Sequence, residues 1–201
     1  MTEPVVHVID DDEAMRESLA FLLDASGLAA HTYESASRFL EMFDGSGSDV
    51  IVSDVRMPEM SGLELARRLK ARETTMPIIM ITGHGDVPLA VEAMKAGVVD
   101  FLEKPFEEEH LLAAIRAALA DSRQKEEEQA ERERIRRVLD SLSPREHEVL
   151  DGVVAGKLNK VIAHELGISP RTVEVYRANV MSKTGARGLS ELVRMVLLAQ
   201  S

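Results

Sequence analysis

Residues 50–54 read Val-Ile-Val-Ser-Asp, a short run of β-forming residues that ends at the carboxylate of Asp54. A Met-Pro pair at 57–58 and a Ser-Gly pair at 61–62 follow, and such residues are typical of a loop between two elements. A continuous apolar run bounded by loop residues indicates a strand buried on both faces, as in a parallel sheet. The stretch therefore predicts a central strand that carries a carboxylate at its carboxyl end.

Three further runs of this kind also end in a reactive side chain. They are residues 5–9 before Asp10-Asp11-Asp12, residues 78–81 before Thr82, and residues 100–103 before Lys104-Pro105. In a parallel sheet the carboxyl ends of the strands share one edge, where open α/β folds bind their ligands. Carboxylates, a hydroxyl and an amine are therefore expected to meet there, although they are far apart in the sequence.

The first 121 residues alternate such β-rich runs with segments whose apolar residues recur at helical spacing. Strands are predicted at 5–9, 29–33, 50–53, 78–81 and 99–102, and helices at 14–26, 35–42, 63–72, 87–96 and from 107 onward. Five β-α units predict a doubly wound, five-stranded parallel sheet with helices on both faces.

Residues 122–140 are rich in Glu, Gln, Lys and Arg, and they contain neither Gly nor Pro. We interpret this segment as a solvated helix that continues the preceding one and acts as a spacer. Charged residues four apart, such as Glu133 and Arg137, stabilise a helix by a few tenths of a kcal/mol for each pair. A disordered tail is the alternative.

Residues 141–201 show a different pattern, with four short helices separated by glycines. Ser143-Pro144-Arg145-Glu146 is a capping box with Pro at the first helical position. The helix that it begins is expected to end at Gly156, and the others are predicted at 160–166, 170–184 and 190–200. A helix, a Gly-containing turn and a capped helix together predict a helix-turn-helix. A four-helix module that binds a protein partner is the alternative.

Net charge differs strongly along the chain, which carries −11 in all. Residues 1–121 contain 10 Lys and Arg against 23 Asp and Glu, a net charge of −13, whereas residues 141–201 contain 8 against 6, which gives +2. The acidic part suits cations such as Mg²⁺. The last part is only mildly basic, so DNA binding has to be argued from its motif.

Composition also indicates the cellular compartment of the protein. The absence of Cys excludes disulfides and thiol chemistry and fits a reducing cytoplasm. The amino terminus lacks the pattern of a signal peptide, and no apolar run approaches the ~20 residues needed to span a bilayer. We therefore expect a cytoplasmic protein without a membrane partner.

The side chains at the four strand ends form a chemically complete set for accepting a phosphoryl group. Asp11 and Asp54 can supply oxygen ligands to Mg²⁺ or Mn²⁺, with Asp10 acting through water. A carboxylate can also be the nucleophile that becomes an aspartyl phosphate. The Lys104 ammonium and the Thr82 hydroxyl would then meet two of the phosphate oxygens. The set predicts phosphorylation of Asp54.

At these residues the chain resembles the receiver domain of two-component response regulators, over about residues 4–121. The resemblance rests on Asp10-Asp11, on Asp-x-x-Met-Pro-x-x-Ser-Gly at 54–62, and on Thr82, Phe101 and Lys104-Pro105. It implies a flavodoxin-like fold and a partner histidine kinase.

The resemblance also implies roles for single residues. The backbone carbonyl of Arg56 would be a metal ligand, and the Lys104-Pro105 bond would be cis. Phe101 would be the aromatic that turns inward when Thr82 is drawn to the phosphate, with a plain core Phe as the alternative. Arg56 and His84 stand two residues beyond Asp54 and Thr82, and we hypothesise that they tune the access of water to the phosphate.

The third predicted helix of the last part, residues 170–184, has two distinct faces. Val173, Val180 and Thr184 recur at i, i+7 and i+11 and should face the core. The residues expected to enter the major groove of DNA are Arg171, Glu174, Val175 and Ala178. Those expected to contact phosphates are Arg171, Arg177 and Lys183, together with Asn179 or Thr172.

This last part resembles the LuxR-type tetrahelical DNA-binding domain. With the stretches at 83–88 and 169–181, the chain as a whole is similar to the FixJ branch of response regulators. That resemblance implies a receiver at 1–121, a charged helical linker at 122–140 and a DNA-binding domain at 141–201. It also implies activation of transcription at promoter DNA, with RNA polymerase as a partner.

The charge of the DNA-binding part raises the question of oligomeric state. A segment of only +2, joined to an acidic domain, should bind DNA weakly as a monomer. We therefore predict a homodimer on phosphorylation, because two recognition helices would then engage half-sites one turn apart.

Two other classes of protein are alternatives. A haloacid-dehalogenase-type phosphatase would use Asp10 as nucleophile and Asp12 as acid-base, but Thr or Val should then follow closely, whereas Glu13-Ala14-Met15 follows here. We therefore predict that the chain is not an enzyme. A DNA-binding regulator that works without phosphorylation is the second alternative, and the intact set of acids, Thr82 and Lys104 argues against it.

Overall fold

The computed structural model describes residues 4–43, 49–72, 74, 76–83 and 87–200. The chain packs as two compact units, Met1–Glu126 and Glu127–Ser201. We call them unit 1 and unit 2. Unit 1 contains two apolar clusters, one on each face of a sheet, and unit 2 contains a third.

Unit 1 is built on a parallel sheet of five strands in the order β2-β1-β3-β4-β5. The strands are β1 (Val5–Ile9), β2 (Ala29–Tyr33), β3 (Val50–Asp54), β4 (Ile78–Thr82) and β5 (Asp100–Glu103). This is the flavodoxin-like strand order, so the predicted fold is confirmed. The β3, β4 and β5 strands differ from their predicted bounds by one residue, which is the usual uncertainty of element ends.

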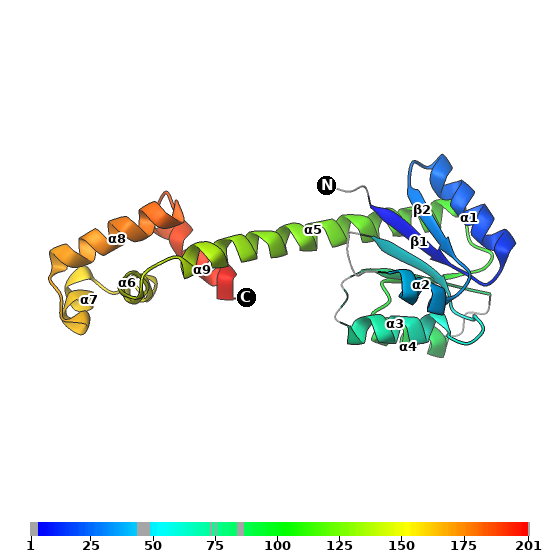
Figure 1. Ribbon diagram of the computed structural model, residues 1–201, viewed down its shortest axis with the longest axis horizontal. Coiled ribbons are helices and arrows are strands. Elements are labelled where there is room, and N and C mark those ends of the chain that lie inside the picture. Colours follow the sequence, from blue (N-terminus) through cyan, green and yellow to red (C-terminus); the bar gives the residue numbers. More distant parts are fainter. Residues whose placement is uncertain (1–3, 44–48, 73, 75, 84–86, 201) are drawn as a thin grey trace. The chain divides into compact units, whose positions relative to one another are not determined.

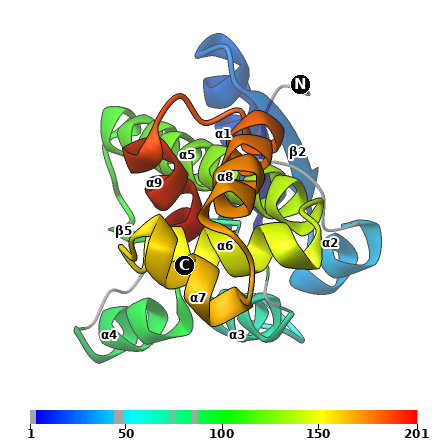
Figure 2. The same cartoon turned by 90° about the vertical axis from the view of Figure 1, so that its left-hand side faces the viewer.

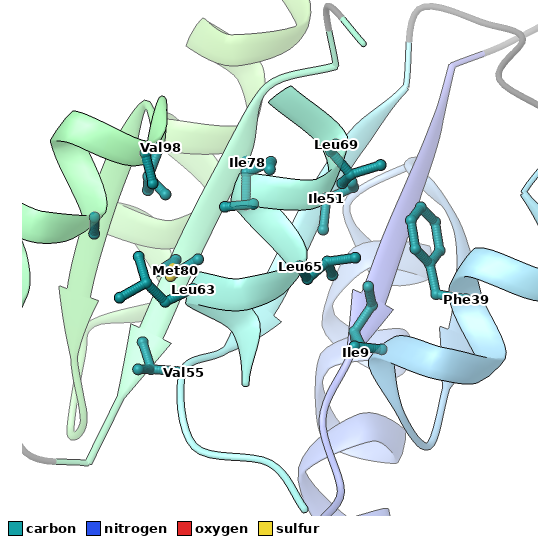
Figure 3. Close-up of a cluster of buried hydrophobic side chains, with 14 of the residues drawn as sticks. Ile9, Phe39, Ile51, Val55, Leu63, Leu65, Leu69, Ile78, Met80 and Val98 are labelled. Atoms are coloured by element: carbon teal, nitrogen blue, oxygen red, sulfur yellow. The ribbon is translucent and has the colours of Figure 1, made fainter. Parts of the chain in front are cut away.

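Helices cover both faces of this sheet (Figure 1). They are α1 (Glu13–Ala25), α2 (Ala36–Met42), α3 (Gly62–Ala71), α4 (Val87–Ala96) and the first part of α5 (Glu108–Asp140). Apolar residues of α1 and α5 pack on one face, and those of α2, α3 and α4 pack on the other. Figure 3 shows the second of these clusters, in which Leu65 of α3 lies close to Ile9 and Ile51 of the sheet.

Burial along the strands explains their sequences. All five residues of β3 and of β4 are buried, which accounts for their continuous apolar runs. The edge strand β2 leaves Ala29, His31 and Thr32 exposed, so its apolar pattern is weak. The helices begin at side-chain caps where the sequence places short polar residues: Asp12 caps α1, Ser35 caps α2 and Ser61 caps α3.

The helix α5 is continuous over 33 residues and includes the charged segment 122–140. Its ion pairs differ in part from the predicted i,i+4 set. The Lys125 Nζ lies 2.7 Å from Asp121 Oδ2, and Arg134 pairs with Glu131 three residues before it at 2.8 Å. The Arg137 Nε donates to the backbone carbonyl of Glu133 at 3.4 Å instead of to its carboxylate.

Unit 2 contains four helices after the end of α5. They are α6 (Pro144–Val154), α7 (Asn159–Leu166), α8 (Pro170–Thr184) and α9 (Leu189–Gln200). The predicted capping box is present, with the Ser143 Oγ accepting from the Glu146 amide at 3.3 Å. A turn joins α7 to α8 (Figure 2). It begins at Gly167, whose φ of 65° requires a residue that tolerates the left-handed region.

The core of unit 2 begins before the predicted domain boundary at 141. Ile135 and Leu139 of α5 are buried with Leu142 against apolar residues of α6, α8 and α9. The capping box that indicates this boundary in the sequence marks only where α6 begins. Packing starts one helix earlier, because the last turns of α5 carry apolar residues.

Among the described residues, no helix is both long enough and apolar enough to cross a membrane.

Candidate functional site

The carboxyl edge of the sheet brings an amine and two acids together. The Lys104 Nζ donates to Asp10 Oδ2 at 3.1 Å and to Asp54 Oδ1 at 2.8 Å. Asp10 follows β1, Asp54 ends β3 and Lys104 follows β5. The strands β1 and β3 are neighbours in the sheet, and the chain continues from them in opposite directions, which makes this the topological switch point of the fold. The expected meeting of these side chains is therefore observed.

Both carboxylates are buried and held by backbone amides. Asp10 is 3% exposed and Asp54 is 8% exposed. Asp10 Oδ1 accepts from the Asp12 amide at 2.9 Å, and Asp54 Oδ2 accepts from the Arg56 amide at 2.5 Å. The Arg16 guanidinium also donates to the Asp10 carbonyl at 2.7 Å, so the strand end itself is fixed.

The site has more negative than positive charge. Burial raises the pKa of the Asp10 carboxyl above its ordinary value, and the nearby Asp54 charge adds to this, although the Asp12 amide and Lys104 act in the opposite direction. Burial acts to lower the pKa of Lys104, but its hydrogen bonds to Asp54 and Asp10 outweigh this and raise it overall. One ammonium thus serves two carboxylates, which favours a further cation beside them.

Thr82 and Phe101 lie on the strands next to this pair. Thr82 ends β4 and is fully buried, and its carbonyl accepts from the Lys104 amide at 2.7 Å. The Lys104-Pro105 peptide bond is cis, as the resemblance implied. Phe101 on β5 is half-buried and packs against the apolar cluster of α2, α3 and α4. The structure therefore brings Thr82 to the expected edge, and its part in a switch with Phe101 stays a prediction.

Asp11 and Arg56 lie at an open groove beside the buried acids. Both side chains are exposed, and the groove is lined by Asp11, Val55, Arg56, Met57, Pro58, Ser61, Leu63 and Leu89. Asp11 and the segment after Asp54 are therefore accessible from the same side. The other predicted modulator of water access, His84, lies outside the described residues.

The donor set fits a hard divalent cation. Among the described residues, no three His, Cys, Asp or Glu side chains gather closely enough to hold a metal by themselves. Mg²⁺ needs only one or two carboxylates, because it retains several waters and accepts backbone carbonyls. The surplus negative charge around Asp10 and Asp54 satisfies the electrostatic requirement.

Sequence reasoning missed the reason for the glycine at the start of α3. A Cβ at Gly62 would lie 2.2 Å from the Asp54 carbonyl oxygen and 2.9 Å from the Ser53 Oγ. The helix therefore approaches the end of β3 so closely that only glycine fits. The Ser-Gly pair of the 54–62 motif was the signal, but a sequence does not show which backbone it will meet.

His7, in the middle of β1, makes polar contacts with two other residues. Its Nδ1 lies 3.0 Å from the Tyr33 hydroxyl and its Nε2 lies 3.1 Å from Asp49 Oδ2. The Phe39 ring packs edge-on against it, with centroids 5.4 Å apart. His7 is thus a packed histidine whose two ring nitrogens both have hydrogen-bond partners. The partners Tyr33 and Asp49 were not predicted.

The helix α8 presents the predicted polar face to solvent. Val173 and Val180 are buried in the core of unit 2, while Thr184 is half-buried and bonds its own helix through the Val180 carbonyl at 2.8 Å. The exposed predicted residues are Arg171, Glu174, Val175, Ala178, Asn179 and Lys183. Val175 is 53% exposed, so its side chain is accessible on this face of α8.

Three residues predicted to contact phosphates make contacts within the unit. The Thr172 hydroxyl lies 2.8 Å from the Ser169 Oγ at the cap of α8. The Arg177 Nη1 donates to Asn159 Oδ1 at 2.6 Å, and the Lys183 Nζ donates to Glu146 Oε2 at 2.7 Å. Their contacts with DNA stay a prediction.

Comparison with known proteins identifies both parts of the chain. Residues 6–116 match the response regulator receiver domain, and residues 140–196 match the luxR family of bacterial regulatory proteins. Both matches are to signalling and DNA-binding domains, not to haloacid-dehalogenase-type phosphatases.

Relatives resemble the chain over nearly its whole length. The transcriptional regulatory protein FixJ of Azorhizobium caulinodans is 56% identical, over 96% of this chain and 92% of that protein. The structure of the response regulator StyR matches with a TM-score of 0.88 and 42% identity, covering 98% of this chain and 99% of that one. Full-length FixJ from B. japonicum matches with a TM-score of 0.62 and 51% identity, covering 100% and 98%. The chain therefore belongs to the FixJ-like two-component response regulators, transcription regulators in which a receiver domain is joined to a LuxR-family DNA-binding domain.

Proposed function

We propose that Asp54 is the residue that accepts the phosphoryl group from the histidine kinase. The observation that carries this proposal is the double hydrogen bond of Lys104 to Asp54 and Asp10 at the carboxyl edge of the sheet. In the transfer, the bond between phosphorus and the donor nitrogen breaks while a bond to an Asp54 oxygen forms. Lys104 then bonds a phosphate oxygen, and the Thr82 hydroxyl at the neighbouring strand end bonds another.

Asp11, Asp54 and the Arg56 carbonyl would hold Mg²⁺ or Mn²⁺, with Asp10 bonding through water. The bound cation supplies neutralisation of charge on the phosphoryl oxygens. The protein residues fix the acceptor: the Arg56 amide and Lys104 each bond one Asp54 oxygen, so the carboxylate is oriented before the donor arrives.

Phosphorylation then has to change contacts elsewhere, because a modification shifts an equilibrium only through differential contacts. We propose that the displaced Thr82 draws Phe101 inward and that the altered surface of unit 1 forms a homodimer. The dimer brings two α8 helices to promoter DNA, where Glu174, Val175 and Ala178 meet base edges and Arg171 meets phosphate. Bound in this way, the protein recruits RNA polymerase and activates transcription.

The Asp54→Asn variant tests the central step. It keeps the size and shape of the side chain but removes the nucleophilic carboxylate and one of its two acceptor oxygens. We expect intact-mass measurement to show no added phosphate after treatment with a small phosphodonor and Mg²⁺. Light scattering should then show no dimer, and DNA binding should remain at the level of the untreated protein.

Asp12→Asn is the matched control, because Asp12 is an exposed acid that follows Asp10 and Asp11 after β1, and Asn also caps helices. It should be phosphorylated and dimerise like the wild type. If Asp54→Asn bound DNA as tightly as the phosphorylated wild type, the alternative of a phosphorylation-independent regulator would replace this proposal.

A further inference from the structure

Two cations of the proposed recognition helix are engaged by other helices of unit 2. The Lys183 ammonium, in the last turn of α8, bonds Glu146 in the first turn of α6. The Arg177 guanidinium, midway along α8, bonds Asn159, the first residue of α7. The helix α8 is thus joined by side-chain hydrogen bonds to both α6 and α7.

The Glu146 carboxylate is buried, at 3% exposure, and its contacts are specific. The Oε2 atom accepts from the Ser143 amide at 2.7 Å and from the Lys183 Nζ at 2.7 Å. A buried charge is costly unless it is both paired and hydrogen-bonded. These bonds lower the pKa of Glu146 to about 2, so the carboxylate is ionised whenever the protein is folded near neutral pH. The position of Lys183 is therefore dictated by a fixed charge.

The Asn159–Arg177 hydrogen bond joins α7 and α8, the two helices of the helix-turn-helix. Leu158, which precedes α7, makes no side-chain cap to the first turn of that helix. The Asn159 amide oxygen instead accepts from Arg177 at 2.6 Å across 18 residues of sequence. This bond fixes the middle of α8 relative to the beginning of α7, at the level where the predicted base-reading residues lie.

Apolar packing leaves room beside the same half of α8. A cavity of about 130 Å³ is lined by Val149, Leu150, Val153, Arg177, Val180, Met181, Leu189 and Leu192. Side chains that border a void lack partner atoms on one side, so they restrain the helix less than a filled core does. The α8 residues that line the cavity are Arg177, Val180 and Met181. The two polar contacts are made by Arg177 itself and by Lys183, which lies two residues after Met181.

We infer that Lys183 and Arg177 are positioning residues that set the angle of α8 for DNA, and that neither is a phosphate contact. This inference rests on the proposed role of α8 in reading DNA and replaces one part of the sequence-based expectation. Phosphate binding then falls to Arg171, while Glu174, Val175 and Ala178 depend on the two contacts for their placement.

A double-mutant cycle on the full chain separates positioning from phosphate contact. The probe is a DNA duplex that the phosphodonor-treated wild type enriches from a random-sequence library. The variants are Lys183→Met, Glu146→Gln and the pair together, with Arg171→Met as the comparator and Lys183→Arg as the conservative change. The readouts are Kd and the slope of log Kd against log salt concentration.

We expect Lys183→Met and Glu146→Gln each to raise Kd about tenfold and the double variant to be no weaker, because the two residues act through one contact. The salt slope should stay unchanged, and Lys183→Arg should restore most of the affinity. Arg171→Met should instead lower the slope by about one, as the loss of one phosphate contact does. A slope lowered by about one in Lys183→Met, with Kd unchanged in Glu146→Gln, would overturn the inference.

The same cycle applies to Arg177→Met and Asn159→Ala, and the same changes in Kd and salt slope are expected.

Hydrogen exchange in the protein without DNA provides a second readout. The α8 amides should exchange faster in Lys183→Met and in Arg177→Met than in the wild type or in Arg171→Met. Unchanged exchange would refute positioning. If the wild type enriched no duplex, the DNA-reading function would fail, while exchange would still decide whether the two contacts hold α8.

Discussion

The role of a single residue at the site depends on its neighbours more than on its own side-chain chemistry. Lys104 could be any surface lysine, yet its ammonium is 2.8 Å from Asp54 and 3.1 Å from Asp10. The convergence was predictable, because strand ends of a parallel sheet share an edge. The backbone contacts were not predictable. The Arg56 amide and the Gly62 Cα lie against Asp54 because of the path of the loop between β3 and α3, which the sequence does not show.

At this scale Gly62→Ala tests how closely α3 approaches the acceptor. The added Cβ would lie 2.2 Å from the Asp54 carbonyl oxygen, and backbone cannot yield as a flexible side chain does. We expect unit 1 to lose about 1–3 kcal/mol of unfolding free energy, the usual cost of overpacking. Urea unfolding followed through the amide resonances of β4 measures this.

The control for that change is Gly83→Ala, since nothing lies within 4 Å of a Cβ at Gly83. It should alter stability by no more than about 1 kcal/mol, mainly through the unfolded chain. Equal stability of the two variants would mean that α3 can move away from β3 at little cost.

Most single elements could be predicted from the sequence, and the ends of the helices were predicted well. Short polar caps and glycines placed nearly every helix within a residue or two. Packing partners were not readable. The apolar residues Ile135 and Leu139 look like the end of a linker, but they are buried in unit 2. Likewise Lys183 looks like a phosphate contact, because a sequence does not reveal that Glu146, 37 residues earlier, lies beside it.

The contact between α6 and α8 predicts a dependence of stability on pH. The folded pKa of Glu146, about 2, is below its ordinary value of 4.5. The contribution of the ionised carboxylate to the unfolding free energy of unit 2 is therefore fully present above about pH 4.5. It is lost as the pH falls from there toward 2. Glu146→Gln should be less stable than the wild type at pH 7, and the difference should narrow as the pH is lowered.

Urea titrations followed by the α8 amide resonances at a series of pH values provide the measurement. Glu148→Gln is the control, because Glu148 lies on the same helix but pairs with Arg145 at the exposed surface. Its effect should be small at every pH. A gap between Glu146→Gln and the wild type that stayed constant down to pH 3 would contradict the assignment.

At the scale of the whole molecule, the two units have separate cores that share one helix. The α5 residues buried in unit 1 include Leu111 and Ile115, and those buried in unit 2 include Ile135 and Leu139. Between them, residues 123–134 are exposed apart from Arg132, which is partly buried. Neither core therefore needs the middle of the helix.

Ala130→Pro tests this independence. Proline inside a helix costs about 3 kcal/mol or more, because it removes a hydrogen bond and clashes with the preceding turn. We expect lower ellipticity at 222 nm and faster hydrogen exchange over residues 123–134, while protection of β3, β4 and α8 is retained. Ala130→Gln, which keeps a good helix former at this exposed position, should change none of these. Loss of protection in β4 of the proline variant would show that the cores depend on the helix.

The exposed middle of α5 also has a consequence for how such proteins diversify. A chain joined to a different partner between residues 123 and 134 keeps every residue of α5 that is buried in either unit. Recombination at this stretch would therefore exchange an entire receiver or an entire output domain without rebuilding a hydrophobic interior. The charged segment is thus the natural splice point for chimaeras that pair one sensory input with another set of genes.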